Sequence, residues 1–303
     1  MNAKDTTNNK NNSTDIRFGI TENIPVDVDF NGADGDMRII IYNTDTSIIP
    51  QFEIPENPLV KSIRGEKGTK ENMLMYHVTL KDKKNFYGFN IVYENGCMIV
   101  KLNNPQTLAK SDKPLSGKTI VVDAGHGGTD GGAPGPGKYP EKVLNQNIAT
   151  LIAEKLEALG AKVVISRPDD NTVDLYERMD ILNDTCPDLA VSVHHNSIAG
   201  SANALKTRGF MALYSNNSGV SLSETISDVV CRNLGREQKP TAYQKLAVAR
   251  NHRFPSTLLE MCFISNVEEY QWSITEGNAE KSADAVVEGI LEYYRNQEKY
   301  LDY

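Results

Sequence analysis

Cysteine and histidine are both scarce in this sequence, and the cysteines show no pattern typical of a metal site. The 303 residues include only four cysteines and five histidines. No two cysteines form a Cys-x-x-Cys pair, so neither a disulfide scaffold nor a cysteine-based zinc site is indicated. Any metal site therefore has to use histidine and carboxylate side chains. The five histidines are His77, His126, His194, His195 and His252.

The chain also lacks a long apolar run and an excess of positive charge. It contains no run of apolar residues as long as the roughly 18 that a membrane-spanning helix needs, so we expect no transmembrane segment. The 40 acidic residues outnumber the 32 basic ones, which gives a formal charge of −8. This balance disfavours a non-specific nucleic-acid binder or a polybasic membrane adaptor. We expect no nucleic-acid partner.

The first third of the chain is typical of a small all-β domain that follows a polar start. Residues 1–14 are rich in Asn, Lys and Thr without the apolar stretch of a secretory signal, and we expect a disordered polar tail there. Residues 15–104 contain short β-branched and aromatic segments between turn residues, which predicts a β-rich domain. Residues 105–117 are mostly polar and contain two prolines, Pro105 and Pro114, so we expect a linker.

Residues 118–303 alternate between strand and helix patterns, which predicts an α/β domain with a mostly parallel sheet flanked by helices. Thr172 is the expected N-cap of the second helix, at 173–183. The expected strands cover 119–122, 162–166, 189–194, 209–214 and 257–263, and the expected helices cover 143–159, 173–183, 222–234 and 279–295.

Two of the expected strands carry a histidine at or just after their carboxyl ends, where the chemistry of an α/β sheet is usually found. Ligands bind at the carboxyl ends of the strands in such sheets. The first strand leads into His126, which lies between glycines, and the third ends in His194 and His195. Because side chains alternate along a strand, His194 shares the face of the small residues Ser192 and Ala190. His194 is therefore the better metal candidate, and we expect His195 to be a partly buried histidine or one that supports the metal ligands.

The histidine loop and two glutamates leave alternatives open at this point. His126 in a glycine-rich loop also suits a structural histidine bonded to a carbonyl group, whereas neither the G-x-G-x-x-G nor the Walker spacing of a phosphate loop is present. Glu141 suits either a first-turn acid stabilised by the helix dipole or a third metal ligand. Glu260 lies between Leu259 and Met261 in an expected central strand, where an unpaired carboxylate is costly. Two histidines and two glutamates satisfy a catalytic zinc site with a separate proton-transfer group.

Six segments, taken together and in this order, are similar to the zinc-dependent N-acetylmuramoyl-L-alanine amidases of the AmiC and LytC type. The resemblance covers about residues 118–294. The segments are VVDAGHGG at 121–128, EK at 141–142, SRPDD at 166–170, LYER at 175–178, SVHHN at 192–196 and LLEMCFISN at 258–266.

The resemblance implies a catalytic zinc ion held by His126, Glu141 and His194, with Glu260 as the catalytic acid and base. It implies hydrolysis of the amide bond between N-acetylmuramic acid and L-alanine in peptidoglycan, the expected partner. Asn196 and Arg250 are candidate substrate contacts, although a structural role fits both equally well.

Three positions depart from the family pattern. His195 stands where a small residue is usual, Cys262 replaces a usual glycine, and His252 has no fixed counterpart. None of these removes a ligand, but both histidines are able to change substrate fit or to hydrogen-bond the ligands. The connections also look too short for the inserted helix that blocks the site in some members, so we expect an open cleft.

The resemblance also sets expectations about the rest of the protein. We expect action outside the cytoplasm, with a secretory signal removed, and a β-rich domain that binds the wall or localises the enzyme. The aromatic residues of that domain suit its core better than a glycan-binding face; they are Tyr76, Phe86, Tyr87, Phe89 and Tyr93. The alternatives to an amidase are a zinc peptidase that cuts within the stem peptide and an inactive wall-binding module. Nothing in the sequence identifies an activating partner.

Overall fold

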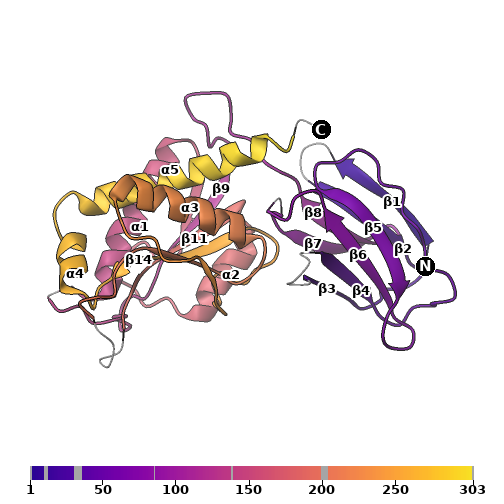
Figure 1. Cartoon of the computed structure of the whole chain (residues 1–303), viewed down its shortest axis with the longest axis horizontal. Helices are drawn as coiled ribbons and strands as arrows, with labels where there is room; N and C mark the ends of the chain where they lie inside the picture. The colour runs from indigo at the N-terminus through magenta and orange to yellow at the C-terminus, as the bar shows by residue number, and fades with distance from the viewer. Residues whose placement is uncertain are drawn as a thin grey trace. The chain divides into compact units, whose positions relative to one another are not determined.

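The chain forms two compact units (Figure 1). The first comprises Met1–Gln106 and Gln297–Tyr303, and the second comprises Thr107–Asn296. The chain therefore leaves the first unit, completes the second and returns to the first. Among the described residues no helix combines the length and hydropathy that a membrane span requires. This computed structural model describes residues 2–9, 13–30, 36–84, 86–137, 139–198 and 204–301.

The first unit contains two four-stranded antiparallel sheets, in the strand orders β1-β2-β8-β7 and β3-β4-β6-β5. Phe18 of β2 packs edge-to-face on Tyr76 of β6 with ring centroids 5.0 Å apart, which joins the apolar faces of the two sheets. The strands are β1 (Asn2–Asn9), β2 (Ser13–Gly19), β3 (Val26–Phe30), β4 (Met37–Ile41), β5 (Val60–Lys67), β6 (Leu74–Leu80), β7 (Phe89–Glu94) and β8 (Cys97–Asn103).

The start of the chain differs from the disordered tail expected over residues 1–14. Asn2–Asn9 form β1 and pair with β2, and Thr14 within β2 is fully buried. Residues 1 and 10–12 of the expected tail lie outside the described residues. Strand pairing uses main-chain groups that every residue except proline carries in full, so the polar composition of this segment gave no indication of it.

The aromatic residues of the first unit mostly belong to its core. Tyr76, Phe86, Tyr87 and Phe89 are all buried, whereas Tyr93 is 39% exposed. The interpretation of these residues as core therefore holds for four of the five.

The second unit is built on one six-stranded sheet with the order β10-β9-β11-β14-β12-β13. The first four strands are parallel, β12 runs antiparallel to β14, and β13 is parallel to β12. The expected α/β fold with a mostly parallel sheet flanked by helices is confirmed. The strands are β9 (Thr119–Ala124), β10 (Lys162–Ile165), β11 (Leu189–Asn196), β12 (Met211–Tyr214), β13 (Ala242–Tyr243) and β14 (Ser256–Phe263). The helices are α1 (Glu141–Ala158), α2 (Leu175–Thr185), α3 (Gly219–Leu234), α4 (Val267–Ser273) and α5 (Asn278–Glu298).

Helix α1 packs on strands β9, β10 and β11. It begins at Glu141, directly after Pro140, and buries one face through Leu144, Ile148 and Leu156 at helical spacing. Because its first turn lies at the carboxyl ends of β9 and β11, the helix delivers Glu141 to the edge of the sheet that carries the histidines.

Helix α2 begins two residues later than expected. Its N-cap is Asp174, not Thr172, and Asp174 and Glu177 form a reciprocal capping box. The hydroxyl of Thr172 instead accepts a hydrogen bond from the Thr129 N–H at 3.0 Å. The Asp174 carboxylate accepts from the N–H groups of Tyr176 and Glu177, and the Glu177 carboxylate accepts from the Asp174 N–H. These bonds explain why Asp174 is the N-cap.

The cap of α2 yields a stability prediction. Replacing Asp174 by Ala should lower the free energy of unfolding by about 1 kcal/mol, because two N–H groups of the first turn lose their acceptor. Denaturant unfolding measures the change. Asp180→Ala, an exposed position in the middle of the same helix, should change stability by less than about 0.5 kcal/mol. Equal effects of the two substitutions would show that the capping box contributes nothing.

Candidate metal centre

The loop after β9 aims His126 across the carboxyl edge of the sheet. His126 itself has a left-handed backbone with φ of 62°, and Gly127 follows with φ of 134°. A side chain at position 127 would also meet the Arg167 side chain at 2.3 Å, so only glycine fits there. The Nδ1 of His126 lies 2.8 Å from an Asp130 carboxylate oxygen, which leaves its Nε2 directed toward Glu141.

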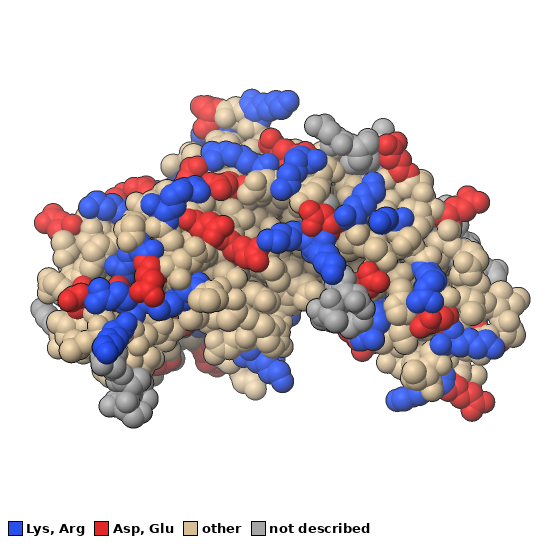
Figure 2. Space-filling view, viewed as in Figure 1, with Lys and Arg blue, Asp and Glu red and all other residues tan. Residues whose placement is uncertain are grey.

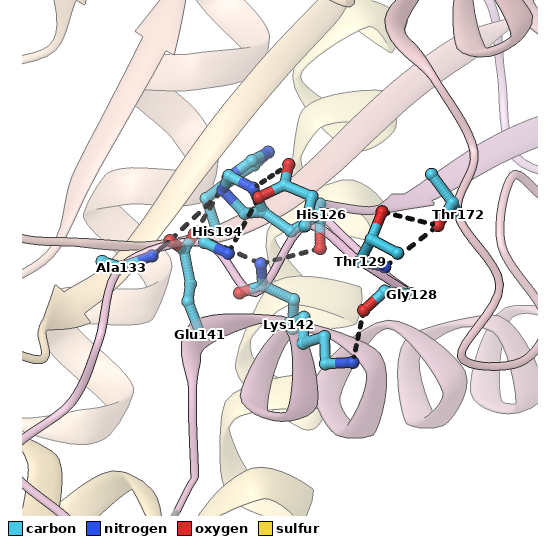
Figure 3. Close-up of polar contacts among 12 residues, drawn as sticks. His126, Gly128, Thr129, Ala133, Glu141, Lys142, Thr172 and His194 are labelled. Carbon is cyan, nitrogen blue, oxygen red and sulfur yellow. Dashed lines mark hydrogen bonds and ion pairs between the residues drawn. The ribbon is translucent and has the colours of Figure 1, made fainter.

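Glu141 is the buried centre of the site (Figure 3). Its Oε2 lies 3.2 Å from His126 Nε2, and its Oε1 lies 3.0 Å from His194 Nδ1. The N–H of Ala133 donates to Oε2 at 2.8 Å, and the N–H of His195 donates to Oε1 at 3.1 Å. Each carboxylate oxygen is therefore held by one main-chain N–H group and one imidazole.

The two histidines of β11 have separate surroundings, as their alternation predicted. His194 is half-buried next to Glu141, whereas His195 is 2% exposed. The Nδ1 of His195 lies 2.7 Å from the Asn145 side-chain oxygen, and Asn145 Nδ2 donates to Glu141 Oε1 at 3.2 Å. Burial lowers the pKa of His195 to about 4, so it is neutral at neutral pH and acts on the site through Asn145.

His126, Glu141 and His194 together can hold a divalent metal ion. One ligand atom from each lies within 4.8 Å of the others. Zinc bonds of about 2.0–2.1 Å bring tetrahedral ligand atoms together at separations of this order. Two imidazole nitrogens with one carboxylate form a donor set found in catalytic zinc sites. The residues present therefore fit zinc.

Glu141 and His126 hold opposite charges in the absence of a metal. Burial opposes ionisation of Glu141, but hydrogen bonds from His126 and His194 outweigh it and hold the pKa of Glu141 well below its usual range. The hydrogen bond to Glu141 raises the pKa of His126 to about 9 against the opposing effect of burial, and Asp130 adds to the rise. His126 is therefore protonated at neutral pH.

Glu260 stands beside the cluster on β14, where it pairs in register with His194 of β11. Its Oε2 is buried and has no hydrogen-bond partner within the part of the chain that the structure describes. Burial raises the pKa of Glu260 to about 7, while His194 opposes the rise. A carboxyl group with this pKa is able both to accept and to donate a proton near neutral pH.

The two candidate substrate contacts lie at opposite edges of the sheet. Asn196 is the last residue of β11, two positions after His194, and its side-chain oxygen accepts from the Ser197 N–H at 2.8 Å. Arg250 belongs to the connection that enters β14 at its amino end. Its Nη2 lies 3.3 Å from Met179 Sδ of α2. Asn196 thus lies two residues from His194 at the carboxyl end of β11, whereas Arg250 lies at the amino end of β14.

The three residues that depart from the family pattern lie in different parts of the second unit. His252 lines a pocket of about 200 Å³ with Arg250, at the amino end of β14. Cys262 is fully buried and packs with Leu144, Ile264 and Tyr270. Of the three departures, only His195 acts on the cluster.

Two residues at the site were missed by the sequence analysis. Asp130 lies four residues after His126, and Asn145 lies four residues after Glu141 on the same face of α1. The helical spacing of Asn145 was a usable signal, because residues four apart on a helix are neighbours. The loop spacing of Asp130 carried no such information.

A sequence model of the N-acetylmuramoyl-L-alanine amidase family, Amidase_3, matches residues 120–292. The chain belongs to this family. The match spans the six-stranded sheet, the cluster of His126, Glu141 and His194, and Glu260. It does not include the two packed antiparallel sheets of the first unit, which form a β-sandwich. The resemblance drawn from the six sequence segments is thereby confirmed.

Relatives of known sequence agree with this membership. The uncharacterised protein YqiI of Bacillus subtilis is 34% identical over 186 residues, which are 61% of this chain and 89% of YqiI. The N-acetylmuramoyl-L-alanine amidase LytC of Bacillus subtilis is 30% identical over 212 residues, which are 70% of this chain and 42% of LytC. The chain therefore spans most of one relative and less than half of the other.

Solved structures agree as well. The amidase AmiC2 of Nostoc punctiforme is similar with a TM-score of 0.56 and 30% identity, over 59% of this chain and 99% of AmiC2. The CwlD amidase of Clostridioides difficile, solved in complex with the GerS lipoprotein, has a TM-score of 0.56 and 27% identity over 59% of this chain and 99% of CwlD. Each similarity covers a share of this chain close to that of the second unit, Thr107–Asn296.

The charges at the cluster predict proton release on metal binding. At pH 7 the metal-free His126, with its pKa of about 9, carries a proton that must leave before its Nε2 binds zinc, whereas Glu141 is already ionised. Zinc binding should release about one proton from His126, and affinity should rise as the pH increases from 7 to 9. Calorimetry in buffers of different ionisation enthalpy measures the protons released. A binding enthalpy that is independent of the buffer would contradict the expected charge of His126.

Proposed function

We propose that the chain is a zinc-dependent N-acetylmuramoyl-L-alanine amidase that hydrolyses the amide bond between N-acetylmuramic acid and L-alanine in peptidoglycan. One observation carries the proposal: Glu260, whose buried Oε2 has no hydrogen-bond partner among the described residues, lies beside a His–Glu–His cluster that fits zinc. Family membership supplies the substrate class, and the cluster supplies the type of chemistry.

Each residue of the site has a distinct role in this proposal. His126, Glu141 and His194 would hold the zinc ion. When bound, the ion supplies an activated water and polarises the amide carbonyl group. Asp130 and Asn145 hold the imidazole of His126 and the carboxylate of Glu141 in their orientations through hydrogen bonds of 2.8 Å and 3.2 Å.

Glu260 moves the proton. Its ionised carboxylate accepts a proton from the attacking water, and the hydroxyl group adds to the lactyl carbonyl carbon. The protonated Glu260 then donates that proton to the alanine nitrogen as the C–N bond breaks. The products are a lactyl carboxylate on the sugar and a stem peptide with a free amino group. A pKa of about 7 suits both halves of this exchange.

The substrate would reach the cluster at the carboxyl edge of the sheet. We propose that Asn196 contacts it there, because Asn196 ends the strand that carries His194. Arg250, at the other end of β14, would meet only a distant part of an extended glycan strand. The open cleft expected from the short connections stays part of the proposal.

Action outside the cytoplasm belongs to the same proposal, since the substrate is the cell wall and cell-wall amidases are among the relatives. Acidic and basic side chains are interspersed over the face of the molecule that Figure 2 shows. A mixed surface does not create the field that draws a protein to a polyanion. We propose that the β-sandwich of the first unit supplies wall binding through specific contacts.

The first test concerns Glu260. Replacing it by Gln should reduce the release of stem peptides from purified sacculi by about 100-fold or more, because the proton-transfer group is lost, while zinc content stays at that of the wild type. Metal analysis and chromatography of the released peptides measure the two quantities. Glu268→Gln, at an exposed glutamate on α4 with its side chain 74% exposed, should cleave like the wild type. Full activity of Glu260→Gln would exclude Glu260 as the acid and base.

The second test identifies the bond that is cut. Mass spectrometry of digested sacculi should show intact stem peptides that begin with free L-alanine, together with glycan strands that keep the lactyl group. Shortened stem peptides still attached to the sugar would instead identify a zinc peptidase. Binding to sacculi with no release in zinc-containing buffer would identify an inactive wall-binding module.

A further inference from the structure

Two buried guanidinium groups surround the backbone that leads into His126. Three consecutive carbonyl groups, those of Ala124, Gly125 and His126, accept hydrogen bonds from Arg167 and Arg178. Arg178 makes the shorter contacts, at 2.8 Å from Nη1 to the Ala124 oxygen and 2.6 Å from Nη2 to the His126 oxygen. Every carbonyl on the path from β9 to the imidazole is therefore bound to a cation.

These contacts fall at the point where the backbone is least favourable. A residue other than glycine with φ near 60° is uncommon, and His126 has φ of 62°. Such a conformation persists where its surroundings fix it. The planar fork of Arg178 spans the carbonyls of residues 124 and 126, which fixes the direction of the peptide group before Gly125 and of the peptide group after His126.

The charge of Arg178 is balanced by one buried acid that also reaches the strand of the other histidine. Asp123 is 4% exposed; its Oδ1 accepts from Arg178 and from the Ser166 hydroxyl, and its Oδ2 accepts from the Ser192 hydroxyl. Burial opposes ionisation, but Arg178 and the two hydroxyls hold the pKa of Asp123 below its usual value. Ser192 lies on β11 two residues before His194. The Asp123–Arg178 pair thus connects the supports of both histidines.

We propose that Arg178, paired with Asp123, is a positioning residue that sets the distance and direction of His126 relative to His194 and thereby the affinity of the site for zinc. Neither side chain donates an atom to the metal cluster. The proposal rests on the zinc site of the proposed function, and it assigns to α2 the task of holding a ligand that lies on another element. According to this proposal, tight zinc binding requires the Asp123–Arg178 pair in addition to the three ligands.

The test measures zinc affinity rather than activity. Arg178→Met keeps the length of the side chain and removes the donors. Its dissociation constant for zinc, measured by competition with a chromogenic chelator at fixed pH, should rise by about 10- to 100-fold, the range found when groups that orient metal ligands are removed. Arg178→Lys keeps the charge but not the fork, so its affinity should lie between those of Arg178→Met and the wild type.

Stability has to be separated from positioning, because removing one member of a buried ion pair leaves the other unpaired. The double variant Asp123→Asn with Arg178→Met removes both charges and should recover most of the lost thermal stability, yet it should still bind zinc weakly. Arg236→Met is the matched control. Arg236 pairs with Glu269 in the same unit, with side chains 9% and 7% exposed, compared with 7% and 5% for Arg178 and Asp123. Arg236→Met should lower the melting temperature and leave the zinc dissociation constant within about twofold of the wild type.

The outcomes distinguish the two proposals. A wild-type chain that binds no zinc would overturn the proposed function itself. If the wild type binds zinc and the double variant binds it equally well, the positioning role of Arg178 is wrong while the zinc site stands. Equal loss of affinity in Arg236→Met would also overturn it, since any destabilisation of the unit would then have the same effect.

Discussion

The contact between the Glu141 carboxylate and two imidazoles is the interaction on which the rest of the site depends. Glu141 is buried at the first turn of a helix, where an ionised acid would be costly without donors. Main-chain N–H groups and the imidazoles of His126 and His194 supply those donors. The result is a charged group fixed between two strands and a helix. Each ligand can therefore be in place before a metal ion arrives.

A second carboxylate nearby shows how strongly the surroundings decide chemistry. Glu141 and Glu260 are both glutamates in the same crevice, yet hydrogen bonds lower the pKa of one and burial without a partner raises the pKa of the other to about 7. In the proposed mechanism this separation of two pKa values gives Glu141 a permanent charge and Glu260 the proton transfer. The difference follows from the surroundings of each residue: Glu141 accepts hydrogen bonds from the N–H groups of Ala133 and His195, whereas Glu260 lies within a strand whose N–H groups are engaged in the sheet.

The sequence was informative where chemistry follows local order. His126 and His194 were predicted because they end strands, and Glu260 because it interrupts an apolar run; the structure brings the first two together with Glu141 and pairs Glu260 with His194. Contacts between distant segments had no such signal. Arg178 reaches the carbonyl group of a residue 52 positions earlier, and nothing in its neighbours indicates that partner. The same holds for β1, whose strand pairing depends on main-chain groups and not on side-chain polarity.

The return of the chain to its first unit has a consequence for how the two units are joined. Gln297–Tyr303 belong to the β-sandwich, where the Gln297 side chain accepts a hydrogen bond from the Gln106 N–H at 2.8 Å and the Tyr300 hydroxyl bonds to Asp82. In topological terms the catalytic unit is an insertion, entered and left at neighbouring points of its host. Cleavage of the peptide between residues 107 and 117 would therefore not free it, because the end of α5 still anchors it. An enzyme connected in this way stays with its β-sandwich even after a nick in the connection that leads into it.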